Sequence, residues 1–135
     1  MNEQRVEQWI ILAEGDLKTA EDELCMSEPF TNSICFHAQQ LVEKYLKAYL
    51  TFYGKPFRKT HDLTELINEC IEFNKDFQNL FELDVDKLTQ YSIDSRYPDD
   101  FYIPSLDEAK EAINLAKEAK TFIIKKFEDN GYRKN

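Results

Sequence analysis

Four side chains on one predicted helix have the types and the spacing to act on a phosphate or on a partner protein. They are His37, Gln40, Lys44 and Lys47, which recur at steps of three and four residues. At about 100° per residue they fall within about 80° of one another, beside an apolar face. We interpret this polar stripe as the lining of a groove for phosphate or for a partner helix. The alternative is a solvated face whose lysine stems cover neighbouring apolar surface.

A second group able to bind an anion stands in the turn Ser95-Arg96-Tyr97-Pro98-Asp99. The residue before Pro98 is pushed out of helical geometry, which predicts a loop here. The Arg96 guanidinium can bind a ligand, because loops bordered by rigid helices often carry binding groups. It can equally form an ion pair with a nearby aspartate that fixes the loop. Tyr97 can stack on a base or simply pack.

His61 precedes Asp62 at the predicted start of a third helix. A carboxylate near an imidazole can hold it in one tautomer, although neighbouring residues on a helix do not face each other. The alternative is that Asp62 caps the helix and His61 packs in the loop before it. A local positive run precedes this pair and contains Lys55, Arg58 and Lys59 around Phe57. It is either a phosphate or nucleic-acid contact or a solvated loop.

Apolar residues at helical spacing indicate the elements that must position these groups. The predicted helices cover about 3–25, 32–53, a third from 61–62 onward, 83–93, and a last one from 105 onward. The stretch 73–81 is less regular and fits a loop or a short helical turn.

Several residues are expected to set the ends of these helices. Thr31 or Asn32 is predicted to cap the second helix, and Gly54 to end it. Ser105 and Glu108 have the spacing of a capping box at the start of the last helix. Four main helices joined by short loops imply an all-α, antiparallel up-and-down bundle of four to five helices. We expect one domain over 1–130 and a frayed tail over 131–135.

Composition narrows the class of protein. The 135 residues are 42% hydrophobic with only 3 glycines, which favours one globular helical domain. The net charge of −9 argues against broad attraction to nucleic acid or to an anionic membrane, although it allows a local basic pocket. No apolar run approaches the ~20 residues that span a bilayer. The cysteines, Cys25, Cys35 and Cys70, are odd in number and lack C-x-x-C spacing, so we expect reduced, structural thiols in a cytoplasmic protein.

Taken together, four segments resemble the HEPN domain family: 35–50, 60–63, 95–99 and the weaker Asp16-Leu17-x-x-Ala20. The resemblance runs in order over nearly the whole chain. It implies a bundle that dimerises, is associated with nucleotides or nucleic acid, and often partners a minimal nucleotidyltransferase in a toxin–antitoxin-like system. With the groups above, it gives a candidate ligand-binding set of His37, Gln40, Lys44, Lys47, His61, Asp62, Ser95, Arg96, Tyr97 and Asp99.

Several branches of that family are metal-independent RNases that use an arginine followed, four to six residues later, by a histidine. The arginine can stabilise charge on a strained phosphate, and the histidine can move protons during attack by the 2′-OH. Arg96 stands in the right region, but Phe101, Tyr102 and Ile103 occupy the positions for the histidine. We therefore expect a non-catalytic interaction protein. The alternatives are an RNase toxin that uses Arg96 with a relocated base such as His61, and a helical scaffold without a ligand.

Metal and cofactor chemistry are not expected. A ferritin-like site needs Glu-x-x-His pairs, but the residues three before His37 and His61 are Ile34 and Arg58. Glycine-rich nucleotide-binding motifs are also absent from the sequence.

Overall fold

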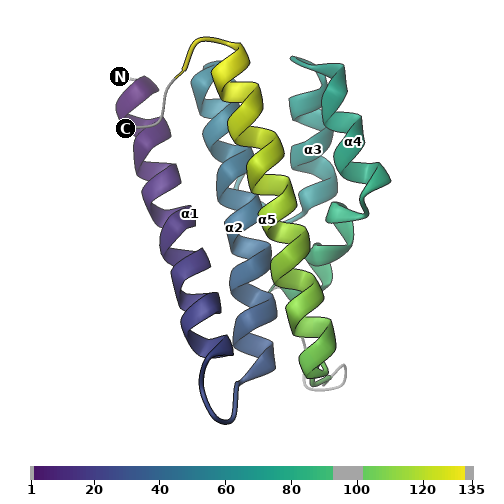
Figure 1. The fold of residues 1–135 in the computed structure, drawn as a ribbon. Helices are drawn as coiled ribbons and strands as arrows, with labels where there is room; N and C mark the ends of the chain where they lie inside the picture. The colour runs from purple at the N-terminus through teal and green to yellow at the C-terminus, as the bar shows by residue number, and fades with distance from the viewer. Residues whose placement is uncertain (1, 93–101, 133–135) are drawn as a thin grey trace.

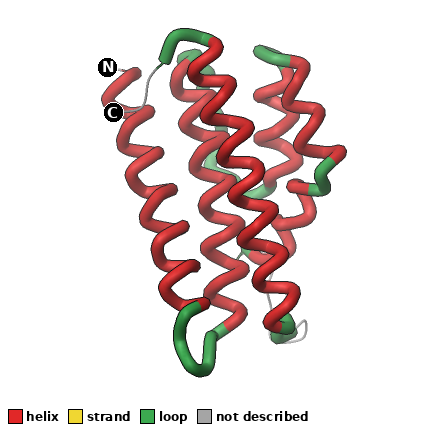
Figure 2. Tube along the Cα trace, in the orientation of Figure 1, coloured by secondary structure: helices red, strands yellow, loops and turns green. Residues whose placement is uncertain are grey.

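Three long helices lie side by side, and a layer of shorter helices packs beside them (Figure 1). The computed structural model describes residues 2–92 and 102–132. The long helices are α1 (Asn2–Leu24), α2 (Thr31–Phe52) and α5 (Leu106–Asp129). The shorter elements are α3 (Leu63–Ile71), η1 (Lys75–Phe77), α4 (Gln78–Glu82) and η2 (Val85–Tyr91), of which η1 and η2 are 3-10 helices. No strand occurs in these two ranges (Figure 2), so the all-α bundle is confirmed.

Three of the predicted helix ends are confirmed by their hydrogen bonds. The Asp62 side chain accepts from the Thr64 N–H at 3.0 Å, and Ser105 Oγ accepts from the Glu108 N–H at 3.0 Å. Gly54 ends α2 with φ 68°, where the N–H groups of Gly54 and Lys55 donate to the carbonyls of Thr51 and Leu50. This pair of bonds is a Schellman motif, which needs the left-handed backbone that glycine adopts without strain.

The predicted cap of α2 is wrong. Thr31 is the first residue of the helix, and Phe30 precedes it without a side-chain cap. Thr31 Oγ1 instead donates to the Pro104 carbonyl at 2.7 Å, and Asn32 Nδ2 donates to the Tyr102 carbonyl at 3.0 Å. These side chains therefore tie the start of α2 to the entry of α5, a tertiary role that competes with capping.

The connection from α2 to α3 runs back along α2. His61 lies beside Glu43, two turns before the end of α2, whereas Lys55 and Glu72, which follow the ends of α2 and α3, form an ion pair at 2.9 Å. The helix α3 is therefore parallel to α2, not antiparallel to it as a short loop would require. This course places the loop before α3 against the middle of α2, where it completes the site described below.

The predicted α-helix over 83–93 is instead the 3-10 helix η2, and the short α-helix α4 ends before this range, at Glu82. Asp84 lies between α4 and η2 with φ 65°, in the left-handed region that interrupts helical geometry. The buried residues of η2 are Val85, Leu88 and Tyr91, a spacing of three that matches the three residues per turn of a 3-10 helix.

An aromatic cluster fills the core where α2, η1 and α5 meet. Tyr49 and Phe77 are fully buried, with ring centroids 4.5 Å apart, and Phe127 packs 5.4 Å from Tyr49. The Tyr132 ring lies 5.0 Å from Phe127, and Gly131 adopts φ 87° in the turn before it. In the expected frayed tail, Gly131 is thus an exposed turn residue and Tyr132 packs on the bundle, whereas 133–135 lie outside the described residues.

The three cysteines are free thiols in different surroundings. Cys25 is exposed just after α1, whereas Cys35 and Cys70 are buried. Burial raises the pKa of the Cys70 thiol well above its ordinary value, so this thiol stays protonated. None of the helices in the described part of the chain is long and apolar enough to cross a membrane.

Candidate functional site

Buried Asp16 on α1 holds two side chains of the polar stripe on α2. Its Oδ1 lies 2.7 Å from His37 Nδ1, and its Oδ2 accepts a hydrogen bond from Lys44 Nζ at 2.6 Å. His37 and Lys44 keep 25% and 19% of their side chains exposed, so the cluster reaches the surface at its edge. One carboxylate therefore fixes both an imidazole and an ammonium group along the α1–α2 contact.

A second cluster surrounds the buried carboxylate of Glu43 on α2. Its Oε2 accepts from Lys47 Nζ at 2.8 Å, and its Oε1 lies 2.9 Å from His61 Nδ1. The side-chain amides of Gln39 and Gln40 also donate to Oε1, at 3.1 and 3.2 Å. The Lys47 side chain is only 8% exposed, so this ion pair is internal.

Hydrogen bonds decide the charge of Glu43. Burial acts to raise the pKa of its carboxyl group, but the bonds from Lys47 and His61 outweigh burial and hold the pKa below its ordinary value. Glu43 is therefore ionised at neutral pH. Because an ionised carboxylate only accepts hydrogen bonds, His61 must carry its hydrogen on Nδ1.

His61 is oriented by Glu43, not by its neighbour Asp62. Asp62 points its side chain at the start of α3, as the capping interpretation proposed. Gln39 Nε2 also donates to the His61 carbonyl at 3.0 Å, which fixes the backbone of the loop. The imidazole remains 40% exposed, so an oriented histidine stands at the surface above a buried carboxylate.

The polar stripe is divided between the two carboxylates. His37 and Lys44 are seven residues apart and turn toward Asp16, whereas Gln40 and Lys47, also seven apart, turn toward Glu43. Seven residues return to nearly the same side of a helix, and the two pairs differ by about 60°. Gln40 and Lys47 are buried, so these two residues brace the bundle instead of lining an open groove.

The predicted loop residues Ser95, Arg96, Tyr97 and Asp99 lie outside the described residues, so their proposed roles stay predictions. The flanking residues Tyr91 and Tyr102 both donate their phenol hydroxyls to the carboxylate of Glu108. Glu108 thus connects the residue at the end of η2 to a residue shortly before α5, on either side of 93–101.

Sequence reasoning placed no role on Asp16, Gln39 or Glu43, which hold the two clusters together. A signal for Glu43 was present: it shares a helical stripe with Leu46 and Leu50, both fully buried. A carboxylate at a core position is rarely tolerated without a partner, and Lys47 stands four residues later.

Lys47 links the Glu43 cluster to two aromatic rings near the surface. Its Nζ lies 5.6 Å from the centroid of Trp9 on α1 and 5.8 Å from that of Phe57 in the loop after α2. These distances are within the range of cation–π attraction. The buried ion pair therefore also helps to hold Trp9 and Phe57 in place.

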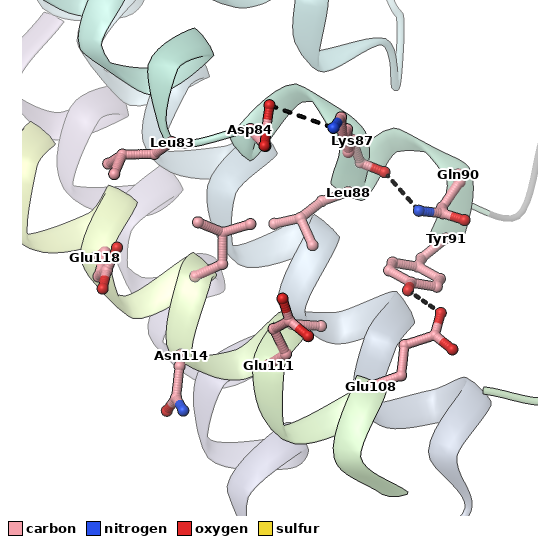
Figure 3. A pocket seen from close by; sticks show the side chains of 12 residues that line it. Leu83, Asp84, Lys87, Leu88, Gln90, Tyr91, Glu108, Glu111, Asn114 and Glu118 are labelled. Carbon is pink, nitrogen blue, oxygen red and sulfur yellow. Dashed lines mark hydrogen bonds and ion pairs between the residues drawn. The ribbon is translucent and has the colours of Figure 1, made fainter. Parts of the chain in front are cut away.

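A groove of about 450 Å³ between η2 and α5 is lined mainly by acidic side chains (Figure 3). Its acidic lining residues are Asp84, Glu108, Glu111 and Glu118, against the single cation Lys87, which pairs with Asp84 at 3.4 Å. Such a lining repels phosphate. In the described ranges, no group of three or more histidine, cysteine, aspartate or glutamate side chains could hold a metal ion.

The chain matches one known domain family. The model of the HEPN domain matches residues 6–127, a range that includes α2, the loop with His61 and most of α1 and α5. Comparisons with curated proteins and with solved structures gave no match.

Proposed function

Because the chain belongs to the HEPN domain family, whose domains are nucleotide- or RNA-related modules, we propose that it is a non-catalytic interaction protein. In this proposal it forms a homodimer, contacts a nucleotide or nucleic acid, and partners a minimal nucleotidyltransferase in a toxin–antitoxin-like system. The family match over residues 6–127 is the observation that carries the proposal.

The sequence after Arg96 favours binding over cleavage. Phe101, Tyr102 and Ile103 stand where the RNase branches of the family have a histidine, so the proton-transfer group of that motif is missing. In addition, Gln40 and Lys47 are committed to the buried Glu43, which favours a structural role for this half of the polar stripe.

A metal-free nuclease assay tests the proposal most directly. Incubation of structured and unstructured RNA with the full chain and a chelator is expected to leave the RNA intact. Cleavage would contradict the proposal and favour the second candidate, an RNase that uses Arg96 with His61. One observation supports that candidate: His61 is exposed and is oriented through Nδ1 by Glu43, as a general base requires. Loss of cleavage in His61→Ala would then identify the base.

Arg96→Ala is expected to weaken nucleotide or RNA binding at least several-fold while leaving the thermal midpoint nearly unchanged. A charge-assisted hydrogen bond to phosphate contributes about 1.5–3 kcal/mol, whereas an exposed ion pair contributes little to folding. Fluorescence anisotropy of a labelled RNA and a thermal melt measure the two effects. Lys110→Ala, which removes an exposed cation from α5, is the control. A large fall in the midpoint with unchanged binding would make Arg96 a structural residue.

We expect the chain to form a homodimer at micromolar concentration. Several large apolar side chains are exposed, including Ile11, Leu12, Phe30 and Ile103, each by more than half of its surface. Contact between two copies would cover part of this apolar surface, and the family resemblance implies a dimer. Light scattering coupled to gel filtration should give twice the 16.0 kDa mass of the chain. A species of 16.0 kDa alone would contradict the dimer.

Co-expression tests whether the chain binds a nucleotidyltransferase partner. A small nucleotidyltransferase encoded beside this chain should co-purify with it when the two are expressed together. Its absence from the purified complex would remove the partner from the proposal while leaving RNA binding to be judged separately.

A further inference from the structure

The first turns of α1 and the loop that follows α2 border an open pocket of about 590 Å³, within the usual size range of ligand pockets. Arg5, Gln8 and Trp9 line it from α1, and Lys55 and Phe57 line it from the loop. We call it the Trp9 pocket. It lies at the C-terminal end of α2. The entry of α5 lies at the other end of α2, where Thr31 bonds to Pro104. The 22 residues of α2 separate the two ends by roughly 30 Å.

The aromatic wall of this pocket is held from inside the protein. The Trp9 and Phe57 rings are partly buried, with centroids 6.2 Å apart and planes inclined by 55°. Lys47 Nζ lies close to both rings and is fixed by the buried Glu43. Because α1 and the α2–α3 loop meet at these rings, the wall is assembled before any ligand arrives, which lowers the entropic cost of binding.

The charge of the Trp9 pocket differs from that of the whole chain. Its lining contains two cations, Arg5 and Lys55, and no carboxylate, whereas the chain carries a net charge of −9. Lys55 Nζ contacts Glu72 Oε1 at 2.9 Å, so part of its charge is compensated. Arg5 is exposed and makes no hydrogen bond or ion pair with any residue in 2–92 or 102–132. Its guanidinium is therefore available for an anion.

We propose that the Trp9 pocket binds a nucleoside phosphate, with the base against the Trp9 and Phe57 rings and the phosphate near Arg5 and Lys55. Aromatic rings accept any base by stacking, and guanidinium groups bind phosphate through two parallel hydrogen bonds. The amide of Gln8 supplies donors and an acceptor for the polar edge of the base. This inference rests on the proposed association with nucleotides or nucleic acid and adds a second contact to the one predicted for Arg96. A free mononucleotide and a nucleotide within a single RNA strand share this chemistry.

Trp9 is the only tryptophan in the chain, so its fluorescence reports on this pocket alone. The full chain is titrated with AMP, adenosine, inorganic phosphate and a short unstructured RNA. Saturable quenching by AMP is expected, with adenosine and phosphate each binding at least about tenfold more weakly because each lacks one of the two contacts. Much tighter quenching by RNA than by AMP identifies a strand as the source of the ligand, and similar affinities identify the free nucleotide; both results support the site.

Arg5→Ala should weaken the quenching by AMP about tenfold, whereas Lys110→Ala, with the same loss of charge on α5, should leave it unchanged. Equal weakening in the two variants would show general electrostatic attraction and overturn the site. Equilibrium dialysis separates this inference from the proposed function. Binding of AMP or RNA without any change in Trp9 fluorescence would overturn the pocket and leave the function standing. No binding by dialysis would overturn both.

Discussion

Glu43→Ala is expected to lower the free energy of unfolding by about 3–5 kcal/mol, because it leaves the Lys47 ammonium buried without its counter-ion. The Lys47 side chain is 8% exposed, and its Nζ is bonded to Glu43 Oε2 at 2.8 Å. The substitution also removes the acceptor of His61 and of two glutamine amides. Urea denaturation at neutral pH, followed by far-ultraviolet circular dichroism, measures the change.

Two variants separate charge from packing. Glu43→Gln keeps the shape of the side chain and removes its charge, so most of the loss should remain. The double variant Glu43→Leu with Lys47→Met removes both charges together and should recover much of the stability, since buried ion pairs are often replaced by apolar residues at little cost. Asp22→Ala, which breaks the exposed pair with Lys18, should leave the stability almost unchanged. A Glu43→Ala effect as small as that of Asp22→Ala would show that water reaches Lys47.

Above pH 10 the chain should lose stability steeply, because three buried tyrosines resist ionisation. Burial, followed by a hydrogen bond to an acceptor, raises the pKa of Tyr45, Tyr49 and Tyr91 above the ordinary value. Tyr45 donates to Glu14 at 2.5 Å, and Tyr91 donates to Glu108. The unfolded chain releases these protons near pH 10, whereas the folded chain keeps them. Stability is therefore complete below pH 10 and falls as the pH rises further.

The size of this effect follows from proton linkage. Each such tyrosine lowers the free energy of unfolding by about 1.4 kcal/mol per pH unit above 10, so the three together lower it by about 4 kcal/mol per pH unit. Urea midpoints at increasing pH, with tyrosinate absorbance recorded in parallel, measure it. Tyr45→Phe removes one of the three groups and should reduce the slope by about a third. The chain has 7 tyrosines, so the 4 others can ionise in the folded chain; ionisation of more than these 4 before unfolding would contradict the prediction.

The helices and several of their ends were predictable because local chemistry determines them. Asp62 and Ser105 cap helices with their own side chains, and Gly54 supplies a backbone conformation that other residues rarely adopt. The parallel course of α3 was not predictable in this way. It depends on the contact of the loop with Gln39 and Glu43, which lie about twenty residues earlier in the chain.

The candidate site was predictable only in part: the sequence indicated four polar side chains on one helix, but not the carboxylates that hold them. The helical wheel correctly grouped His37, Gln40, Lys44 and Lys47 on one side of α2. It could not show that Asp16 and Glu43 divide them, because a difference of about 60° becomes decisive only when the neighbouring elements are known. Likewise, only the fold brings Trp9 of α1 beside Phe57 of the loop after α2.

The unequal burial of the three thiols makes the chain suitable for selective labelling. A maleimide reacts with the accessible thiolate, so Cys25 should be modified while Cys35 and Cys70 stay protected without any substitution. Cys25 lies sixteen residues after Trp9, about 24 Å along the axis of α1 and its extension. The chain thus carries a natural donor and a natural attachment point for an acceptor of resonance energy transfer. Mixing labelled and unlabelled chains would then report how the two copies of the proposed homodimer are oriented.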